Sequence, residues 1–168
     1  MPTSFSGAAL PFWDLLLRLT VAALLGGVIG FERERHEKPA GLRTHMLVTL
    51  GSAAFVVIGV EVLGQISEGY DHARLDPTRV IEGVIGGIGF LGAGSIIQSR
   101  GDVRGLTTAA SVWISGALGA ACGVAMYRIA IVTTAFALVT LWLVGVVQKK
   151  TLHHDRTGSD ARADRGPD

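Results

Sequence analysis

Five long apolar segments dominate the sequence, at residues 12–31, 44–66, 80–98, 106–126 and 129–148. Each is about 20 residues long, the length that a helix needs to cross a hydrocarbon layer of ~30 Å. A helix also satisfies its backbone hydrogen bonds within one segment, as a bilayer requires. The sequence therefore predicts an all-α integral membrane protein, in which residues 1–148 form a bundle of five transmembrane helices with a glycine-rich third helix.

The composition agrees with a membrane protein, since 49% of the residues are hydrophobic, only 17% are charged and the mean hydropathy is +0.45. The net charge of +1 gives no reason to expect a nucleic-acid partner, so the expected environment is the lipid bilayer. Residues 149–168 are polar and rich in charge. They are predicted to form a disordered cytoplasmic tail, because such a segment buries too little apolar surface to fold.

The orientation follows from Lys and Arg, which stay preferentially in the cytoplasm. With the N-terminus outside, the inner loops and tail carry eleven of these residues and the outer loops carry three. The sequence thus predicts a multi-pass protein of the bacterial inner membrane, with its N-terminus outside and its C-terminus in the cytoplasm.

Gly87, Gly89 and Gly92 have the G-x-G-x-x-G spacing of a dinucleotide loop. That motif needs a preceding strand, a following amphipathic helix and an acidic residue about 20 positions on, whereas these glycines lie inside an apolar segment. No zinc spacing or nucleophile with a plausible base is present either. We therefore expect no cofactor, no metal site and no enzymatic activity.

The glycines of the third segment admit two membrane interpretations. One is a central helix on which all the others pack, since small residues let helices approach closely. The other is a partly unwound helix lining an ion site, as in transporters. The glycines expected at helix contacts are Gly26, Gly30, Gly83, Gly87, Gly94, Gly119 and Gly123.

Charged residues within or near the apolar segments also admit more than one interpretation. Asp14 and Arg18 stand four residues apart, a spacing that predicts a local ion pair with Arg18 reaching outward to the membrane surface. Glu82 lies near the outer end of the third helix, where a charge must pair or meet water. It is a candidate intramembrane polar site, either paired with Arg79 or binding a cation.

Three motifs carry a resemblance to a known family. They are "GGVIGFERERHEKPAGLRTHMLVTLGSAAF" from Gly26, "GGIGFLGAGSI" from Gly86 and "VRGLTTAASVW" from Val103. In this order they closely resemble the hydrophobic domain of MgtC/SapB membrane proteins, over roughly residues 15–127. Many such proteins continue into a cytoplasmic domain, which is not expected after Gln148. Some relatives also have Asn at the position of Thr107.

The resemblance implies an inner-membrane protein linked to low magnesium, acid stress and intracellular survival of pathogens. Its better-studied relatives are understood as regulators, including of the ATP synthase. We therefore expect a regulator that acts through other membrane proteins, with ATP synthase as one candidate partner; the alternative is an oligomeric channel or transporter for Mg²⁺ or another cation. A homo-oligomer is compatible with either.

The charged residues of the resembling motifs fall in the two inner loops. Opposite charges there could lock the loops together or form a docking surface for a partner. The residues concerned are Glu32, Glu34, Arg35, Arg43 and Arg104, with Thr107 beside them as a further candidate.

Overall fold

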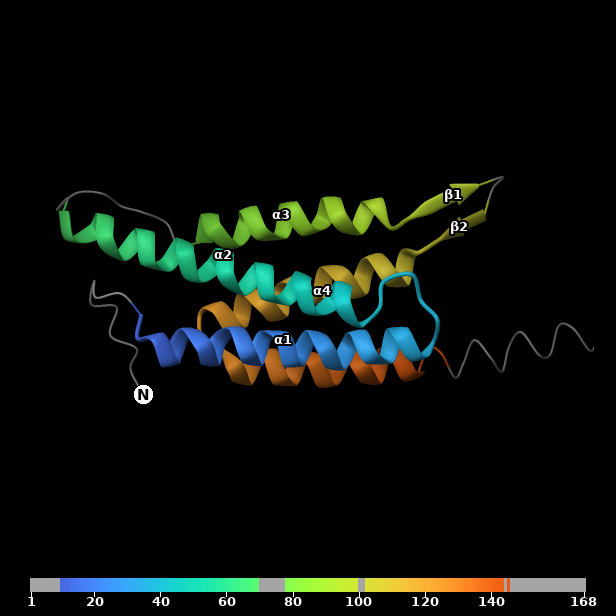
Figure 1. The fold of residues 1–168 in the computed structure, drawn as a ribbon. Coiled ribbons are helices and arrows are strands. Elements are labelled where there is room, and N and C mark those ends of the chain that lie inside the picture. The colour runs from blue at the N-terminus through green and yellow to red at the C-terminus, as the bar shows by residue number, and fades with distance from the viewer. Residues whose placement is uncertain (1–9, 70–77, 100–101, 144, 146–168) are drawn as a thin grey trace, which may run out of the picture.

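The computed structural model describes residues 10–69, 78–99, 102–143 and 145. Its helices are α1 (Phe12–Arg35), α2 (Leu42–Gly69), α3 (Thr78–Gly94), α4 (Leu106–Gly123) and a fifth helix, Tyr127–Leu143. A short antiparallel hairpin of β1 (Ile97–Ser99) and β2 (Asp102–Arg104) joins α3 to α4. The helices run lengthwise beside one another (Figure 1). The predicted all-α membrane bundle is confirmed.

Among the described residues, three helices are long and apolar enough to cross a membrane by length and composition: α1, α2 and α4. The fifth helix is apolar over its described residues. Helix α3 has 17 residues, which at 1.5 Å each span about 25 Å, slightly less than a hydrocarbon core. The predicted tail, residues 149–168, lies outside the described residues.

Helix α4 occupies the centre of the bundle. Ten of its 18 residues are buried, and most of them are small. Glycines also bring α1 against α2, since a β-carbon on Gly30 would lie 2.7 Å from the Cα of Leu42. The core between these helices and the fifth contains Ala22, Ile29, Ala53, Leu118, Cys122 and Ala130.

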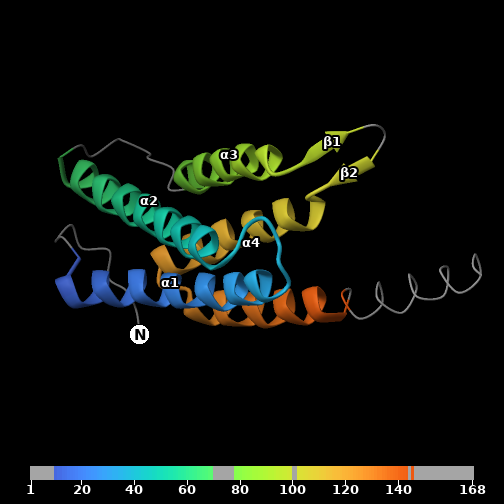
Figure 2. The same cartoon turned by 45° about the vertical axis from the view of Figure 1, so that its right-hand side comes forward.

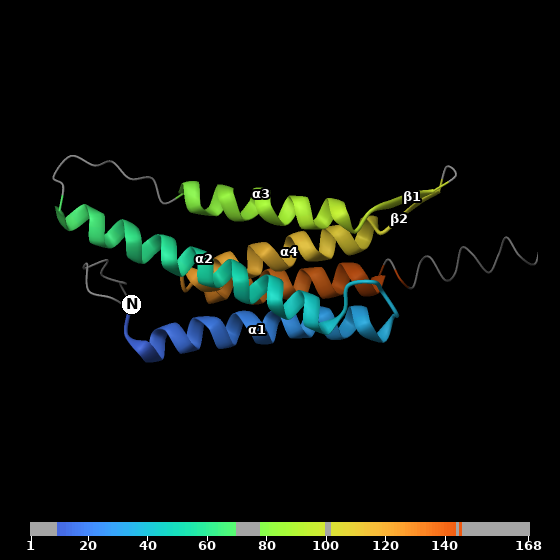
Figure 3. The same cartoon turned by 45° about the horizontal axis from the view of Figure 1, so that its top comes forward.

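Helix α3 lies at the edge of the bundle, along α4 (Figures 1 and 3). Only Ile88 and Gly92 are buried on it, with Ile88 against Gly116 and Gly92 against Ala109 of α4. The expectation of a central third helix packed by all the others is therefore wrong, because α4 has small residues on more of its faces. The alternative of an unwound segment does not hold either, since α3 is continuous from Thr78 to Gly94.

The hairpin replaces the end of the predicted third helix and the loop that was expected after it. The helix ends at Gly94 rather than Gln98, and Ile97 pairs with Arg104 across the two strands. Gly105 then turns the chain into α4 with φ +89°, a conformation that favours glycine. A β-carbon there would also strike the carbonyl oxygen of Ser95, so this turn needs glycine for two reasons.

Candidate functional site

Parts of the first and third resembling motifs lie at the same end of the bundle. The turn between α1 and α2 lies at the same end as the β1–β2 hairpin, whereas the turn between α4 and the fifth helix lies at the opposite end (Figures 1 and 2). We call the described part of this end, residues 32–43, 97–99 and 102–107, the hairpin end. It carries Glu32, Glu34, Arg35, Arg43 and Arg104, the charged residues proposed to lock the inner loops or to dock a partner.

Two acidic side chains of the hairpin end, Glu32 and Glu34, bind groups within the α1–α2 turn. Glu32 forms a two-pronged ion pair with its neighbour Arg33, whose Nη2 lies 2.8 Å from Glu32 Oε1, and its carboxylate also lies 3.1 Å from His36 Nδ1. Arg33 is only 3% exposed. Glu34 Oε2 accepts a 2.7 Å hydrogen bond from the backbone N–H of Leu42, the first residue of α2. These acids therefore hold the α1–α2 turn itself together.

The basic side chains behave differently. Arg35, Arg43 and Arg104 are all exposed, although they come from the end of α1, the start of α2 and strand β2. Thr107, in the first turn of α4, is exposed beside them. Because Glu32 and Glu34 are bound within the turn, the exposed arginines place positive charge on the surface of the hairpin end, with Glu37 as an exposed acid of the same turn.

A seam of buried polar side chains runs between α2 and α4 behind the hairpin end. His45 is fully buried, and its two ring nitrogens lie 2.8 Å from the carbonyl oxygen of Gly41 and 3.0 Å from Ser111 Oγ. A carbonyl only accepts, so Nδ1 carries a proton, and in the neutral ring Nε2 is an acceptor. The single proton of the Ser111 hydroxyl is shared between Nε2 and the carbonyl oxygen of Thr108, which lies 2.8 Å away. This contact ties α2 directly to α4.

The buried hydroxyl side chains of the seam are Thr49 and Ser52 on α2 and Thr108, Ser111 and Ser115 on α4. The hydroxyls of Thr49, Ser52, Ser111 and Ser115 donate to carbonyl oxygens of their own helices. Ser52 donates to Val48 O and Ser115 to Ser111 O, each four residues earlier. The sequence analysis missed this seam. Its signal was the helical spacing of 45, 49 and 52 and of 108, 111 and 115, which places each set on one face.

Glu82 lies on the outside of the bundle. Its side chain is exposed, and within the described part of the chain it forms no ion pair with Arg79 or any other residue. The described residues also contain no group of three or more His, Cys, Asp or Glu side chains that could hold a metal ion. Among them, no residue supports either the pairing of Glu82 with Arg79 or a cation site at Glu82.

The expected packing glycines fall into two sets. Gly26, Gly30, Gly119 and Gly123 lie at helix contacts, where an added β-carbon would meet backbone or side-chain atoms of α2. Gly83, Gly87 and Gly94 meet nothing within 4 Å in the described structure. These three glycines of α3 therefore lie away from the other described helices.

Asp14 and Arg18 form the expected ion pair, with Arg18 Nη2 2.7 Å from Asp14 Oδ2. The expected outward direction of Arg18 is wrong, because its side chain is buried and Nη1 donates to the carbonyl oxygen of Gly123 on α4. That carbonyl belongs to the last turn of α4 and has no partner within its own helix.

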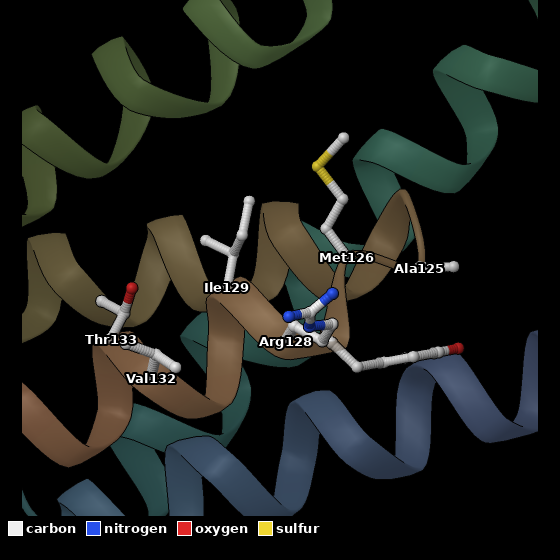
Figure 4. A pocket seen from close by; sticks show the side chains of 7 residues that line it. Ala125, Met126, Arg128, Ile129, Val132 and Thr133 are labelled. Atoms are coloured by element: carbon white, nitrogen blue, oxygen red, sulfur yellow. The ribbon is translucent and has the colours of Figure 1, made fainter.

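A hollow of about 610 Å³ lies at the end opposite the hairpin. Figure 4 shows its side chains around the turn between α4 and the fifth helix. The lining residues are Ala125, Met126, Tyr127, Arg128, Ile129, Val132 and Thr133. Arg128 is the one charged residue among them, so this hollow offers no acidic ligand to a cation.

Comparison with known proteins agrees with the motifs. The chain is 39% identical to "Putative magnesium transporter YhiD" of Escherichia coli (strain K12) over 76% of its own length and 59% of that protein. It is 43% identical to Protein SrpB of Synechococcus elongatus, over 76% and 72% of the two chains. It is 47% identical to Protein MgtC of Brucella abortus (strain 2308), over 71% and 47%.

The chain therefore spans about half to three fifths of the YhiD and MgtC relatives. No solved structure matches it. The profile of the MgtC family matches residues 19–150, which include all the helices after the start of α1 and the whole hairpin end. Because this match covers most of its length, the chain belongs to the MgtC family.

Proposed function

We propose that this protein is a non-enzymatic regulator in the bacterial inner membrane, and that it acts by docking its hairpin end on another membrane protein. The regulated process is adaptation to low magnesium or acid stress, including survival inside host cells. The partner's contact surface is acidic, because it must complement the exposed Arg35, Arg43 and Arg104.

One observation carries this proposal. At the hairpin end Glu32 and Glu34 are bound within the α1–α2 turn, whereas the three arginines are exposed. The pairing of these two acids within the turn leaves Arg35 and Arg43 exposed, and neither forms an ion pair with another described residue. Arginine is well suited to bind carboxylates in an interface.

The interior of the bundle favours regulation over transport. The hydroxyls of Thr49, Ser52, Ser111 and Ser115 in the α2–α4 seam are bonded to their own helices or to His45, so these four do not need a passing ion as a partner. Glu82, the acid expected to bind a cation, is exposed on the outside of the bundle. The name of the relative YhiD keeps magnesium transport as the competing function to be tested.

The orientation has its own test. The eleven-to-three distribution of Lys and Arg supports a hairpin end in the cytoplasm. A single cysteine placed at Lys38, which is exposed in the α1–α2 turn, should resist a membrane-impermeant thiol reagent in intact spheroplasts and react after lysis. A cysteine at Arg128, at the opposite end, should react both in intact spheroplasts and after lysis. The reverse pattern would invert the topology.

The docking proposal is tested by charge reversal in the full chain. Arg43→Glu and Arg104→Glu should each abolish the growth benefit at low magnesium, while protein abundance and thermal stability stay at the wild-type level, because exposed charges contribute little to stability. Arg128→Glu reverses an exposed arginine at the opposite end and serves as the matched control. Full benefit in both hairpin-end variants would refute docking through this surface.

Transport is tested with the same proteins in liposomes. We expect no flux of Mg²⁺, K⁺ or H⁺ above that of empty liposomes, and we expect Glu82→Gln to retain the growth benefit. Saturable flux in wild-type protein that Glu82→Gln abolishes would make the protein a conduit. In that case the regulatory proposal would be abandoned.

A further inference from the structure

The outer face of α3 carries glycines that contact no other described helix, together with exposed charged side chains. Between Gly83 and Gly94, five of the six glycines meet nothing within 4 Å, and Gly92 alone contacts α4. The bundle glycines Gly26 and Gly119, by contrast, leave no room for a β-carbon. A glycine destabilises a helix by about 1 kcal/mol relative to alanine in water. For Gly26 and Gly119, close packing between helices offsets this loss. For the five open glycines of α3, no contact with a described residue does so.

The residues of this face form a regular stripe. Positions 79, 82, 86, 89 and 93 alternate steps of three and four residues, as on one side of a helix that meets a parallel helix. The stripe consists of Arg79, Glu82, Gly86, Gly89 and Ala93, and all five are exposed. At 100° per residue its centre lies about 120° away from the side that Ile88 and Gly92 turn toward α4. We call these five residues the α3 stripe.

The charges of the α3 stripe indicate what covers it. Arg79 and Glu82 have opposite charge and no ion-pair partner in the described part of the chain. Charged side chains on a membrane helix usually pair with one another. Three residues separate the two, about 4.5 Å along the helix axis. A second, parallel α3 would thus bring its Glu82 within reach of Arg79, and its Arg79 within reach of Glu82.

A two-fold axis parallel to the helices would place the positive Arg79 of each copy against the negative Glu82 of the other. Such self-complementarity is what an interface between two identical copies requires. Beyond the charges, Gly86, Gly89 and Ala93 allow two helix backbones to approach closely. We propose that two copies of this chain form a parallel dimer through the α3 stripe, with reciprocal Arg79–Glu82 pairs at one end and glycine contacts along the rest. This dimer does not depend on the regulatory role proposed above.

Cysteine cross-linking in native membranes tests the dimer directly. Gly86→Cys places a thiol at the centre of the α3 stripe, and a disulfide forms only when the two Cα atoms come within about 7 Å. Gly51→Cys is the matched control, since Gly51 also has open space around it but lies on α2. The wild-type chain is the blank, because its single cysteine, Cys122, is buried.

We expect mild oxidation to give a disulfide-linked species of twice the chain mass from Gly86→Cys and none from Gly51→Cys or wild type. No dimer from Gly86→Cys, or equal dimer from both variants, would overturn the proposal. An adduct of a different mass would show that another membrane protein covers the stripe, and would likewise overturn it.

Charge exchange separates the proposed pairing from a merely close approach. In the Gly86→Cys chain, Arg79→Glu and Glu82→Arg should each lower the cross-linked fraction several-fold, because each places like charges opposite one another. The two changes together restore opposite charges and should restore cross-linking. Abundance and elution as a folded species in detergent are measured alongside. Single exchanges without effect, or a double exchange without rescue in a folded protein, would contradict the reciprocal pairs and with them the proposal.

Discussion

Arg18 of α1 donates a 2.6 Å hydrogen bond from Nη1 to the carbonyl oxygen of Gly123, which lies 105 residues later at the end of α4. Its Nε and Nη2 atoms both bond to Asp14 Oδ2. One buried guanidinium therefore pairs with an acid on its own helix and supplies a donor to the last turn of the central helix. This arrangement fixes the position of α4 relative to α1 at the end opposite the hairpin.

Replacing Arg18 tests this link. Arg18→Met keeps much of the length of the side chain but removes all of these hydrogen bonds. We expect the free energy of unfolding to fall by about 1.5–3 kcal/mol, the usual range for hydrogen bonds to a charged group. Thermal unfolding in detergent measures the change. Arg128→Met removes an exposed arginine at the same end and should leave stability near that of wild type; equal loss in both variants would contradict the role of Arg18.

Two adjacent glycines of α1 provide a test of helix packing. A β-carbon on Gly26 would lie 2.6 Å from the carbonyl oxygen of His45, whereas one on Gly27 would meet nothing closer than 3.6 Å, at Met46 Cγ. Gly26→Ala should push α1 from α2 and lower stability by about 1–3 kcal/mol. Gly27→Ala should be neutral or slightly stabilising, because alanine favours the helix. Similar melting temperatures for the two variants would refute the close contact at Gly26.

Glu34 caps α2 from outside that helix, through its 2.7 Å hydrogen bond from the N–H of Leu42. Glu34→Ala removes both an acceptor and a negative charge from this helix N-terminus. We expect a loss of about 0.5–2 kcal/mol, as for other helix-capping residues. The control is Glu37→Ala in the same turn. The Glu37 side chain is exposed and forms no hydrogen bond with another described residue. If amide hydrogen exchange in the first turn of α2 rises equally in both variants, Glu34 is not the cap.

The contact between His45 and Ser111 is tested by a double-mutant cycle. Thermal stability is measured for wild type, His45→Phe, Ser111→Ala and the double variant. Residues that share a hydrogen bond typically couple by about 0.5–3 kcal/mol, and we expect a value in that range. Pairing His45→Phe with Thr134→Ala gives the control, since the Thr134 hydroxyl donates to Ala130 O in the fifth helix. Strict additivity for His45 and Ser111 would show that the contact contributes nothing.

The sequence alone was enough to predict the helices, because apolar segments of this length in a bilayer have to satisfy their backbone hydrogen bonds internally. It also indicated the Asp14–Arg18 pair, which depends on helical spacing within one segment. Gly26, Gly30, Gly119 and Gly123 could be placed at helix contacts for the same reason, since small residues at such spacings commonly mark close approach.

The tertiary structure decided which helix lies at the centre and which side chains meet across helices. Lipid and protein interior are equally apolar, so hydrophobic periodicity does not show which face of a membrane helix is buried. For that reason the glycines of α3 suggested a central helix, although α4 occupies that place and the α3 stripe faces outward. The direction of Arg18 and the capping by Glu34 depended on where a distant backbone carbonyl and N–H came to lie. Those positions result from the packing of several helices at once, and no single segment of the sequence contains them.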